Sequence, residues 1–409
     1  MRLLYFAAHQ AWPLTSGNRL RDYHQARELA KRGPVTFVEM CHPGEEPSNV
    51  PSDSGFEEVV SLRKGAGYTP GKIVRGMAGS TPLTALNYFQ PEAAAQLIKL
   101  LARIQFSTVQ MEGVHLSGYL PVIQKAVHRS AIVVDWHNIE SELMWRYSEN
   151  EPLWPKRIVA KRTAALLEKT EALLLDQCGA HTVASDRERD QLLARNPSAN
   201  VHVVPNGIDT AYFSPEELAR IQGNTPGSTV KRWILFVGSM DYHANVDAAI
   251  WFAREMWPSI GQKHPELEFL IVGRNPPSAV RELASSRIRV TGTVPDVRPF
   301  YARAAAAVVP LRVGSGTRLK ILEAMAAGVP VVSTQLGAEG IDGKHGIHLL
   351  LADSAPDFVA AVDRLVASSE TFSRLTKTAR DLVIRLYDWH RVGEELSRIH
   401  DSLRMMAAR

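Results

Sequence analysis

Cysteine is scarce in this chain of 409 residues, which contains only Cys41 and Cys178. Two isolated thiols form neither a disulfide framework nor the closely spaced pairs of a zinc site. The sequence therefore predicts buried thiols in a protein of the reducing cytoplasm. The chain also lacks an Asp-x-Asp motif that would hold Mg²⁺ or Mn²⁺, so no metal and no other cofactor is expected.

Excess charge is also small, with a net charge of +4 and a sequence pI near 9.0. That excess suits anionic substrates or an anionic membrane surface and is too weak to indicate a nucleic-acid partner. No apolar run reaches the roughly 18 residues of a membrane span. Membrane contact is therefore expected to be peripheral, at the inner face of the plasma membrane. The N-terminal apolar run, residues 1–12, is interpreted as a first strand rather than a signal peptide.

Short apolar runs alternate with helical patterns along the whole chain, which is typical of parallel α/β sheets. The length favours two domains rather than one core. Residues 214–230 are rich in Pro, Gly and Ser, which indicates a loop between the domains. We therefore expect two Rossmann-like doubly wound sheets, with a boundary after residue 205. Strands are expected at 3–7, 35–40, 59–62, 108–112, 131–135, 181–185 and 201–204, then at 233–237, 269–273, 288–290, 308–311 and 329–332.

A strand, a glycine-bearing turn and a helix follow one another between residues 308 and 327. The turn is Gly314, Ser315, Gly316 and Thr317, and the helix is expected from Arg318 to Ala327. Backbone amides are exposed at a helix start, where the helix dipole also favours anions. Arg318 and Lys320 oppose that dipole, and a bound diphosphate would explain them. Glu323 follows on the same helix face.

Two stretches of the N-terminal half are also candidate functional segments. Residues 63–89 combine basic and apolar side chains, so they either lie on a membrane, line an acceptor cleft or form a helical excursion packed on their own domain. Asp135, His137 and Glu140 follow a strand end, the edge at which open α/β sheets bind ligands. His137 either contacts a donor sugar or acceptor or satisfies a local backbone group.

Several ordered motifs resemble those of the GT-B glycosyltransferases, in particular the retaining family 4 group. The most specific is Leu-Lys-x-x-Glu-Ala-Met-Ala-x-Gly-x-Pro-Val-Val, which begins at Leu319. The N-terminal loop with Gly17 matches in position and type. The other matching stretches, in chain order, are 204–213, 236–240, 269–273, 290–296 and 387–389.

This resemblance implies that a nucleoside-diphosphate sugar binds to the C-terminal domain, residues 206–386. A glycan or lipid-linked acceptor binds to the N-terminal domain, residues 1–205, which the tail helix 387–409 rejoins, and reaction occurs in the cleft between. The expected activity is metal-independent transfer with retention, in cell-surface polysaccharide synthesis.

The resemblance also gives individual residues roles. Arg318 and Lys320 are expected on the diphosphate, and Glu323 on the ribose diol. Val294 is a candidate neighbour of the base. Residues expected to line the donor site are Gly17, Gly238, Ser239, Gly314, Ser315, Gly316 and Thr317.

The sequence departs from the family pattern at three positions. Ser315 stands where the first carboxylate of a Glu-x7-Glu pair is usual, and Ser239 and Asn245 stand where Arg and Lys are usual. Arg318 and Lys320 are expected to compensate for the two missing cations. Because of these departures, a non-catalytic nucleotide-sugar-binding partner stays an alternative, as does a GT-B nucleotide-sugar 2-epimerase.

Overall fold

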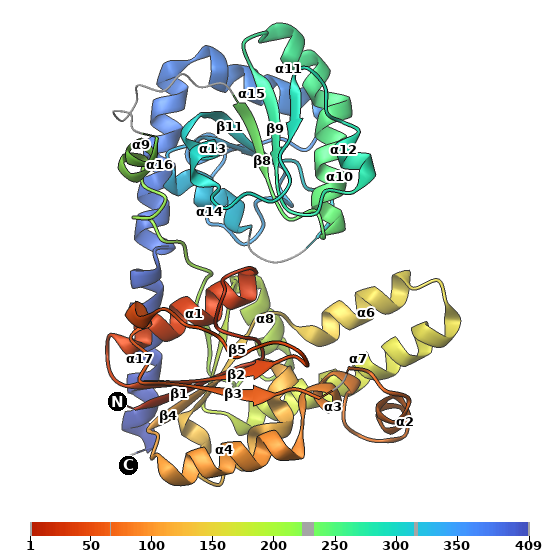
Figure 1. Cartoon of the computed structure of the whole chain (residues 1–409), viewed down its shortest axis with the longest axis vertical. Helices are drawn as coiled ribbons and strands as arrows, with labels where there is room; N and C mark the ends of the chain where they lie inside the picture. The colour runs from red at the N-terminus through yellow and green to blue at the C-terminus, as the bar shows by residue number, and fades with distance from the viewer. Residues whose placement is uncertain (1, 66, 223–232, 315–317, 408–409) are drawn as a thin grey trace. The chain divides into compact units, whose positions relative to one another are not determined.

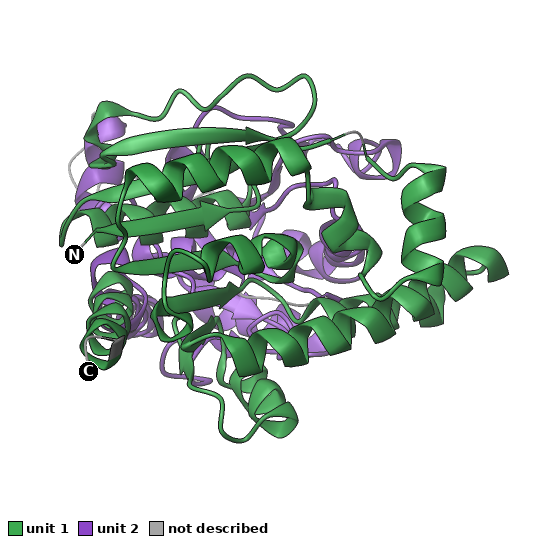
Figure 2. Ribbon diagram, turned by 90° about the horizontal axis from the view of Figure 1, so that it is seen from below, with its two compact units in different colours: residues 1–205, 392–409 green, residues 206–391 purple. Residues whose placement is uncertain are grey.

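The computed structural model describes residues 2–65, 67–222, 233–314 and 318–407. Its chain divides into two compact units (Figure 2). Unit 1 is Met1–Pro205 together with Val392–Arg409, and unit 2 is Asn206–Arg391.

Unit 1 is built on a seven-stranded parallel sheet in the order β3-β2-β1-β4-β5-β6-β7 (Figure 1). Most of its strands are buried, since helices cover both faces, and apolar runs such as the Leu3–Ala7 strand meet that requirement. The strands are β1 Leu3–Ala7, β2 Val35–Cys41, β3 Glu58–Arg63, β4 Thr108–Glu112, β5 Ile132–Trp136, β6 Ala180–Val183 and β7 Val201–Val203.

The helices of unit 1 include a long hairpin, α6 with α7, which are packed together. The helices are α1 Gly17–Ala30, α2 Pro70–Ala78, α3 Leu83–Tyr88, α4 Pro91–Arg103, α5 Leu120–Ile123, α6 Glu140–Asn150, α7 Trp154–Gln177, α8 Asp186–Arg195 and α17 Trp389–Ala407, with 3-10 turns η1 Ser52–Ser54, η2 Val114–Tyr119 and η3 Arg129–Ala131. After β4 the chain forms η2 and the short α5, with Pro121 in the first turn of α5, where a missing N–H costs no hydrogen bond.

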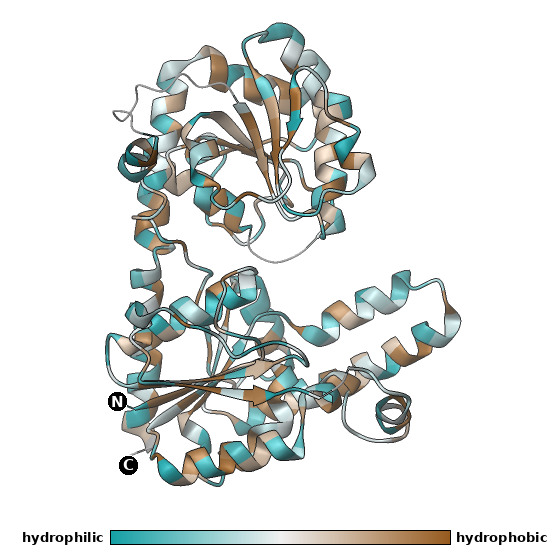
Figure 3. Ribbon diagram, in the orientation of Figure 1, coloured by the Kyte–Doolittle hydropathy of each residue, from teal (hydrophilic) through white to brown (hydrophobic). Residues whose placement is uncertain are grey.

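Unit 2 has a six-stranded parallel sheet in the order β10-β9-β8-β11-β12-β13. Its strands are apolar, as their brown colour in Figure 3 shows, and form the centre of the core. The strands are β8 Trp233–Val237, β9 Glu268–Val272, β10 Ile288–Val290, β11 Ala304–Val309, β12 Val331–Ser333 and β13 Leu350–Leu351. The helices are α9 Pro215–Ile221, α10 His243–Trp251, a π-helical turn Phe252–Met256, α11 Trp257–Lys263, α12 Ser278–Arg281, α13 Arg298–Ala302, α14 Leu319–Ala326, α15 Ala355–Ala367 and α16 Ser369–Leu386. Two doubly wound parallel sheets confirm the predicted fold class.

The chain rejoins unit 1 within α17, at Val392 rather than at the predicted residue 387. The reason is that Ile208 N–H donates to the Tyr387 carbonyl at 2.7 Å and the Trp389 ring packs against Gly207, which holds these residues in unit 2. A Cβ on Gly207 would lie 2.5 Å from that ring. Beyond this point the stripe Val392, Leu396, Ile399 and Leu403 is buried, as an amphipathic docking helix requires.

Candidate active site

Lys320 lies at the carboxyl end of the unit 2 sheet, on the first turn of α14. Its Nζ donates to Asn245 Oδ1 at 2.6 Å, and Asn245 Nδ2 donates to the Ser239 carbonyl at 2.7 Å. A Cβ on Gly238 would lie 2.8 Å from Nζ, so the absence of a side chain there gives the ammonium its place. Asn245 stands where the resembled family usually has Lys. Here its side chain positions the ammonium of Lys320, which comes from α14.

Burial makes the charge on Lys320 costly. Burial, to which the nearby Arg318 adds and which Glu323 opposes, lowers the pKa of its ammonium to about 7. Its hydrogen-bond partner is a neutral amide, and its Nζ lies 4.7 Å from the Phe236 ring centroid. An anion bound beside Lys320 would favour the charged form and raise this pKa again.

Arg318 is the N-terminal cap residue of α14. The helix therefore begins at Leu319, one position later than predicted. Its side chain is buried, and burial lowers the pKa of the guanidinium. Gly314 has φ +116, and a Cβ there would lie 3.1 Å from Arg318 NH2 and 2.5 Å from the Tyr242 hydroxyl. The turn and the helix start therefore converge on Arg318, whereas Ser315, Gly316 and Thr317 lie outside the described residues.

Glu323 is half-buried on α14 with one carboxylate oxygen engaged. The Tyr301 hydroxyl donates to Glu323 Oε2 at 2.8 Å, and burial raises the pKa of the carboxyl while Tyr301 and Lys320 oppose that shift. The second oxygen is the one that suits a ribose hydroxyl. Tyr301 comes from α13, and no feature of the sequence around it indicated this contact.

Arg274 is a cation of the same region that the sequence analysis missed. It follows the β9 strand, and its Nε donates to Ser239 Oγ at 3.0 Å and to Asp241 Oδ2 at 2.8 Å. The loops after β8 and β9 touch closely, because a Cβ on Gly273 would lie 1.8 Å from the Gly238 carbonyl oxygen. A guanidinium from β9 therefore occupies the neighbourhood in which the family usually places an arginine from β8. Gly273 and Arg274 follow directly on this strand, and that Gly-Arg pair is the sequence signal that could have indicated a cation here.

His137 is the centre of a buried cluster of acids in unit 1. Its Nε2 lies 3.1 Å from Asp22 Oδ1, and its Nδ1 lies 3.1 Å from Glu112 Oε1. Asp135 Oδ2 is 3.4 Å from Nε2. Burial opposes a charged imidazole, but the acids, Asp22 first, hold the pKa of His137 well above its usual value. The side chain is 7% exposed, and its two ring nitrogens face acids, which favour the charged imidazole.

Arg21 pairs with Asp135, one of the three acids of this cluster. Its Nε and NH2 donate to the two oxygens of Asp135 at 2.8 and 2.7 Å, and its NH1 donates to the Val204 carbonyl at 2.9 Å. Thr182 Oγ1 donates to the same carboxylate at 2.6 Å. Although burial acts to raise it, Arg21 lowers the pKa of Asp135, whereas burial and Asp22 raise that of Glu112.

Comparison with known proteins decides the family. A model described as Glycosyltransferase Family 4 matches residues 23–212, and one described as Glycosyl transferases group 1 matches residues 231–368. Together they cover most of both units. The chain belongs to the family 4 glycosyltransferases of the GT-B fold. The resemblance given by the motif at Leu319 is thereby confirmed.

Relatives and solved structures agree with this family. The chain is 30% identical over 213 residues to phosphatidyl-myo-inositol mannosyltransferase of Mycobacterium tuberculosis, with 49% of this chain and 53% of that protein covered. This chain thus spans about half the length of the curated relatives it matches. Sucrose-phosphate synthase from Thermosynechococcus elongatus has a similar fold, with a TM-score of 0.68, 17% identity and full coverage of both chains. Anabaena HepE, solved in complex with UDP, has a TM-score of 0.65 at 13% identity, with 98% and 100% covered.

In this family 4 chain the predicted donor residues of unit 2 are brought together in part. Gly238 and Lys320 are in contact, and Arg318 borders Gly314. The Ser239 carbonyl accepts from Asn245, the partner of Lys320, and the Ser239 hydroxyl accepts from Arg274. Val294 packs against the core of unit 2, so its contact with a base stays a prediction.

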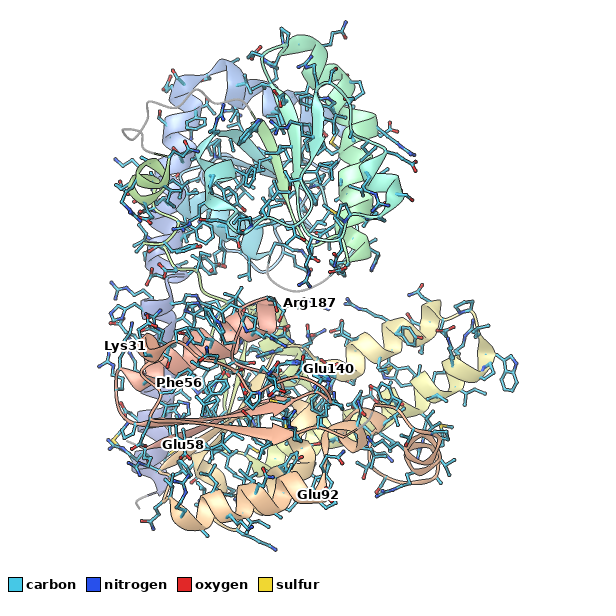
Figure 4. The ribbon with its side chains drawn as sticks, in the orientation of Figure 1. Lys31, Phe56, Glu58, Glu92, Glu140 and Arg187 are labelled. Atoms are coloured by element: carbon cyan, nitrogen blue, oxygen red, sulfur yellow. The ribbon has the colours of Figure 1, made fainter. Side chains whose placement is uncertain are left out.

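The remaining predicted residues belong to unit 1. Gly17 is exposed at the start of α1, the helix that carries Asp22 to His137. Figure 4 shows Glu140 at the start of α6, where burial raises the pKa of its carboxyl to about 7 and the acid Glu171 adds to the shift.

Among the described residues, one group has the spacing to hold a metal ion: Asp22, Asp135 and His137. Arg21 and Thr182 already occupy the Asp135 oxygens, and His137 faces Asp22. Those donors fit a self-contained ionic network better than a cation site.

Proposed function

We propose that this protein transfers a sugar from a nucleoside-diphosphate sugar to a glycan or lipid-linked acceptor, with retention and without a metal ion, in cell-surface polysaccharide synthesis. The observation that carries the proposal is the half-buried Lys320, held by a neutral amide at a sheet edge with Arg318 beside it. Two such cations suit the charge that develops on a departing diphosphate. The Anabaena complex with UDP and the mannosyltransferase relative support a donor and a lipid-linked acceptor of these classes.

In the proposed reaction the bond from the anomeric carbon to the diphosphate breaks and a bond to the acceptor oxygen forms, with release of the hydroxyl proton. Lys320 and Arg318 stabilise the leaving diphosphate, with Arg274 as a further cation at its edge. Glu323 accepts the ribose hydroxyls through the oxygen that Tyr301 leaves open. For His137 to donate a hydrogen bond to the sugar or acceptor, one of its ring N–H groups must leave Asp22 or Glu112.

A panel of nucleotide sugars tests the proposal, because a ligand that prefers the folded state raises the melting temperature. The stabilising donor is then incubated with EDTA, with and without an acceptor panel. Sugar transfer that persists in EDTA is the expected result. Epimerisation of the donor without an acceptor would identify the 2-epimerase, and binding without turnover would identify the non-catalytic partner.

Lys320 makes donor binding pH-dependent. Because the pKa of the free ammonium is about 7, most Lys320 side chains are neutral at pH 8, and a bound diphosphate favours the charged form. We therefore expect proton uptake on binding of the nucleoside diphosphate at pH 8, and weaker binding as the pH rises above 7. Calorimetry in two buffers of different ionisation enthalpy measures the uptake. The Lys320→Met protein should show none; unchanged uptake in that variant would contradict the assignment.

We also propose peripheral contact with an anionic membrane at the cytoplasmic face. Trp154 and Leu153, at the start of α7, are 71% and 53% exposed, and Lys156 and Lys161 follow on the same helix. Among the described residues, no helix has the length and apolar character to cross a bilayer.

Replacing Lys156 and Lys161 together by methionine should weaken sedimentation with phosphatidylglycerol vesicles. Each lysine near such a surface contributes about 1 kcal/mol, so the expected loss is about 30-fold at low salt. Wild-type sedimentation should itself decrease as salt is added. Lys377→Met, on the exposed side of α16, is the control of like charge. Salt-independent sedimentation, or none, would rule out this mode.

A further inference from the structure

Basic side chains follow four neighbouring strands of unit 1 at one edge of the sheet. In the order β3, β2, β1 and β4, the strands are followed by Lys64, His42, His9 and His115. Because all four strands are parallel, their carboxyl ends lie along the same edge, where open α/β sheets bind their ligands. The row belongs to one unit and ends next to the His137 cluster on β5.

Lys64 begins this row, after the edge strand β3. It is 7% exposed, and its Nζ lies 3.6 Å from the centroid of the Tyr88 ring. That ring in turn meets the His115 ring edge-on, with centroids 5.0 Å apart. Among the described residues no carboxylate lies within ion-pair distance of Lys64 Nζ. Glu45 favours the charged form of Lys64 only from beyond that distance. A nearly buried ammonium is thus held by an aromatic face and by no anion.

The second basic residue near Lys64 comes from α2. Lys72 Nζ donates to Asn87 Oδ1 and to the Gly67 carbonyl, both at 3.3 Å, which directs it back toward the segment that follows β3. Asn87 and Tyr88 are adjacent on α3, and α3 packs against η2, which carries His115. Residues 63–89, which the sequence left open among three interpretations, therefore fold back over the row.

The groups of this row repel one another. After burial, Lys72 lowers the pKa of Lys64, and Lys64 lowers the pKa values of His42 and His115. The acids at this edge are already engaged: Glu45 accepts from the His42 backbone N–H at 2.9 Å and lies 3.7 Å from Arg19, and Glu112 faces His137. Lys64 has no carboxylate within ion-pair distance among the described residues and is further disfavoured by Lys72, so a bound anion would relieve the cost of its charge.

We propose that this edge of unit 1, centred on Lys64, binds a phosphate group carried by the acceptor. The inference rests on the proposed function, since it names the class of acceptor for that reaction. A phosphate oxygen would accept from Lys64 and Lys72. A phosphorylated sugar and a phospholipid headgroup share this chemistry.

The test uses the full chain and sn-glycerol 3-phosphate, whose binding is followed by broadening of its ³¹P resonance. Lys64→Met should lower the affinity of the unit 1 site for sn-glycerol 3-phosphate about tenfold, the loss expected for one charge-assisted contact. Lys99→Met, which removes an exposed lysine from α4, should bind like wild type. Lys64→Arg keeps the charge over Tyr88 and should restore most of the affinity, which separates a lost contact from a misfolded protein.

Lys320→Met separates this site from the donor site, because phosphate also suits Lys320. We expect two independent components, one lost in each variant. If Lys320→Met removes all binding and Lys64→Met none, the acceptor site is overturned and the donor site stands. If Lys64→Met removes all binding and Lys320→Met none, the acceptor site stands and the donor assignment fails. If Lys64→Met and Lys99→Met bind sn-glycerol 3-phosphate equally well, the proposal is overturned, whether the two changes are made in the wild type or in the Lys320→Met protein.

Phosphatidylcholine vesicles with phosphatidic acid distinguish the two phosphate sources. A lipid headgroup as ligand predicts that Lys64→Met reduces sedimentation with these vesicles more than Lys99→Met does. Equal sedimentation of the two variants, together with Lys64-dependent binding of sn-glycerol 3-phosphate, identifies a soluble phosphate ester. Equal behaviour of the two variants with both probes leaves only surface charge and overturns the proposal.

Discussion

Replacing Lys320 by methionine is expected to lower kcat/KM for donor turnover by about 10²–10³-fold, the loss typical when one preorganised stabiliser of transition-state charge is removed. Methionine has a similar length and keeps the contact with Phe236, so the packing around Gly238 changes little. What disappears is the ammonium that Asn245 aims at the sheet edge. Because burial makes that ammonium costly in the free protein, the variant should be no less stable than wild type.

A rate effect without a stability effect is therefore the signature of this residue. Turnover is measured with the nucleotide sugar that the thermal panel identifies, and stability by urea unfolding. Lys344→Met, on the surface of unit 2, removes the same charge outside the site and should retain wild-type turnover. A Lys320→Met enzyme with wild-type kcat/KM would show that the diphosphate binds elsewhere.

The fold of both units could be predicted because each strand is a short apolar run with helices on both faces. Leu3–Ala7 and Trp233–Val237 show this pattern, and both are central or near-central strands. The motif from Leu319 also placed Lys320 and Glu323 correctly on one helix, since spacing along a helix is local information.

The partners of those residues could not be predicted, because they come from other elements. Asn245 reaches Lys320 from α10, Tyr301 reaches Glu323 from α13, and Arg274 approaches Ser239 from β9. Periodicity indicates which face of an element is buried, not which element it meets. Ser239 and Asn245 were interpreted as missing cations, whereas the structure makes them the hydrogen-bond partners of Arg274 and Lys320.

The α1 helix shows the same limit for unit 1. Its apolar stripe includes Tyr23, Ala26 and Leu29, and these are buried as expected. Arg21 and Asp22 are buried as well, although charged residues at a helix surface normally face water. They are buried because β5 offers Asp135 and His137 as partners, and no hydrophobic pattern reports such a pairing.

Replacing Arg21 by methionine is expected to destabilise unit 1 by about 3–5 kcal/mol, the cost of leaving one partner of a buried ion pair without the other. Arg21 is 3% exposed, and it holds both oxygens of Asp135 as well as the Val204 carbonyl. Without it, three acids remain around a single imidazolium. Hydrogen exchange of the β1, β4 and β5 amides measures the loss within unit 1 alone, which matters because two units need not unfold together.

Arg27→Met provides the matched control, since the two arginines share α1 and undergo the same change. Arg27 is 3.5 Å from Asp53, but the two side chains are 34% and 72% exposed, so its loss should cost at most about 1 kcal/mol. If the cost at Arg21 arises from the unpaired carboxylate, Asp135→Asn in the Arg21→Met background should cost less than it does in the wild type. Additive losses, or equal losses for Arg21→Met and Arg27→Met, would mean that the charge balance of the His137 cluster does not hold unit 1 together.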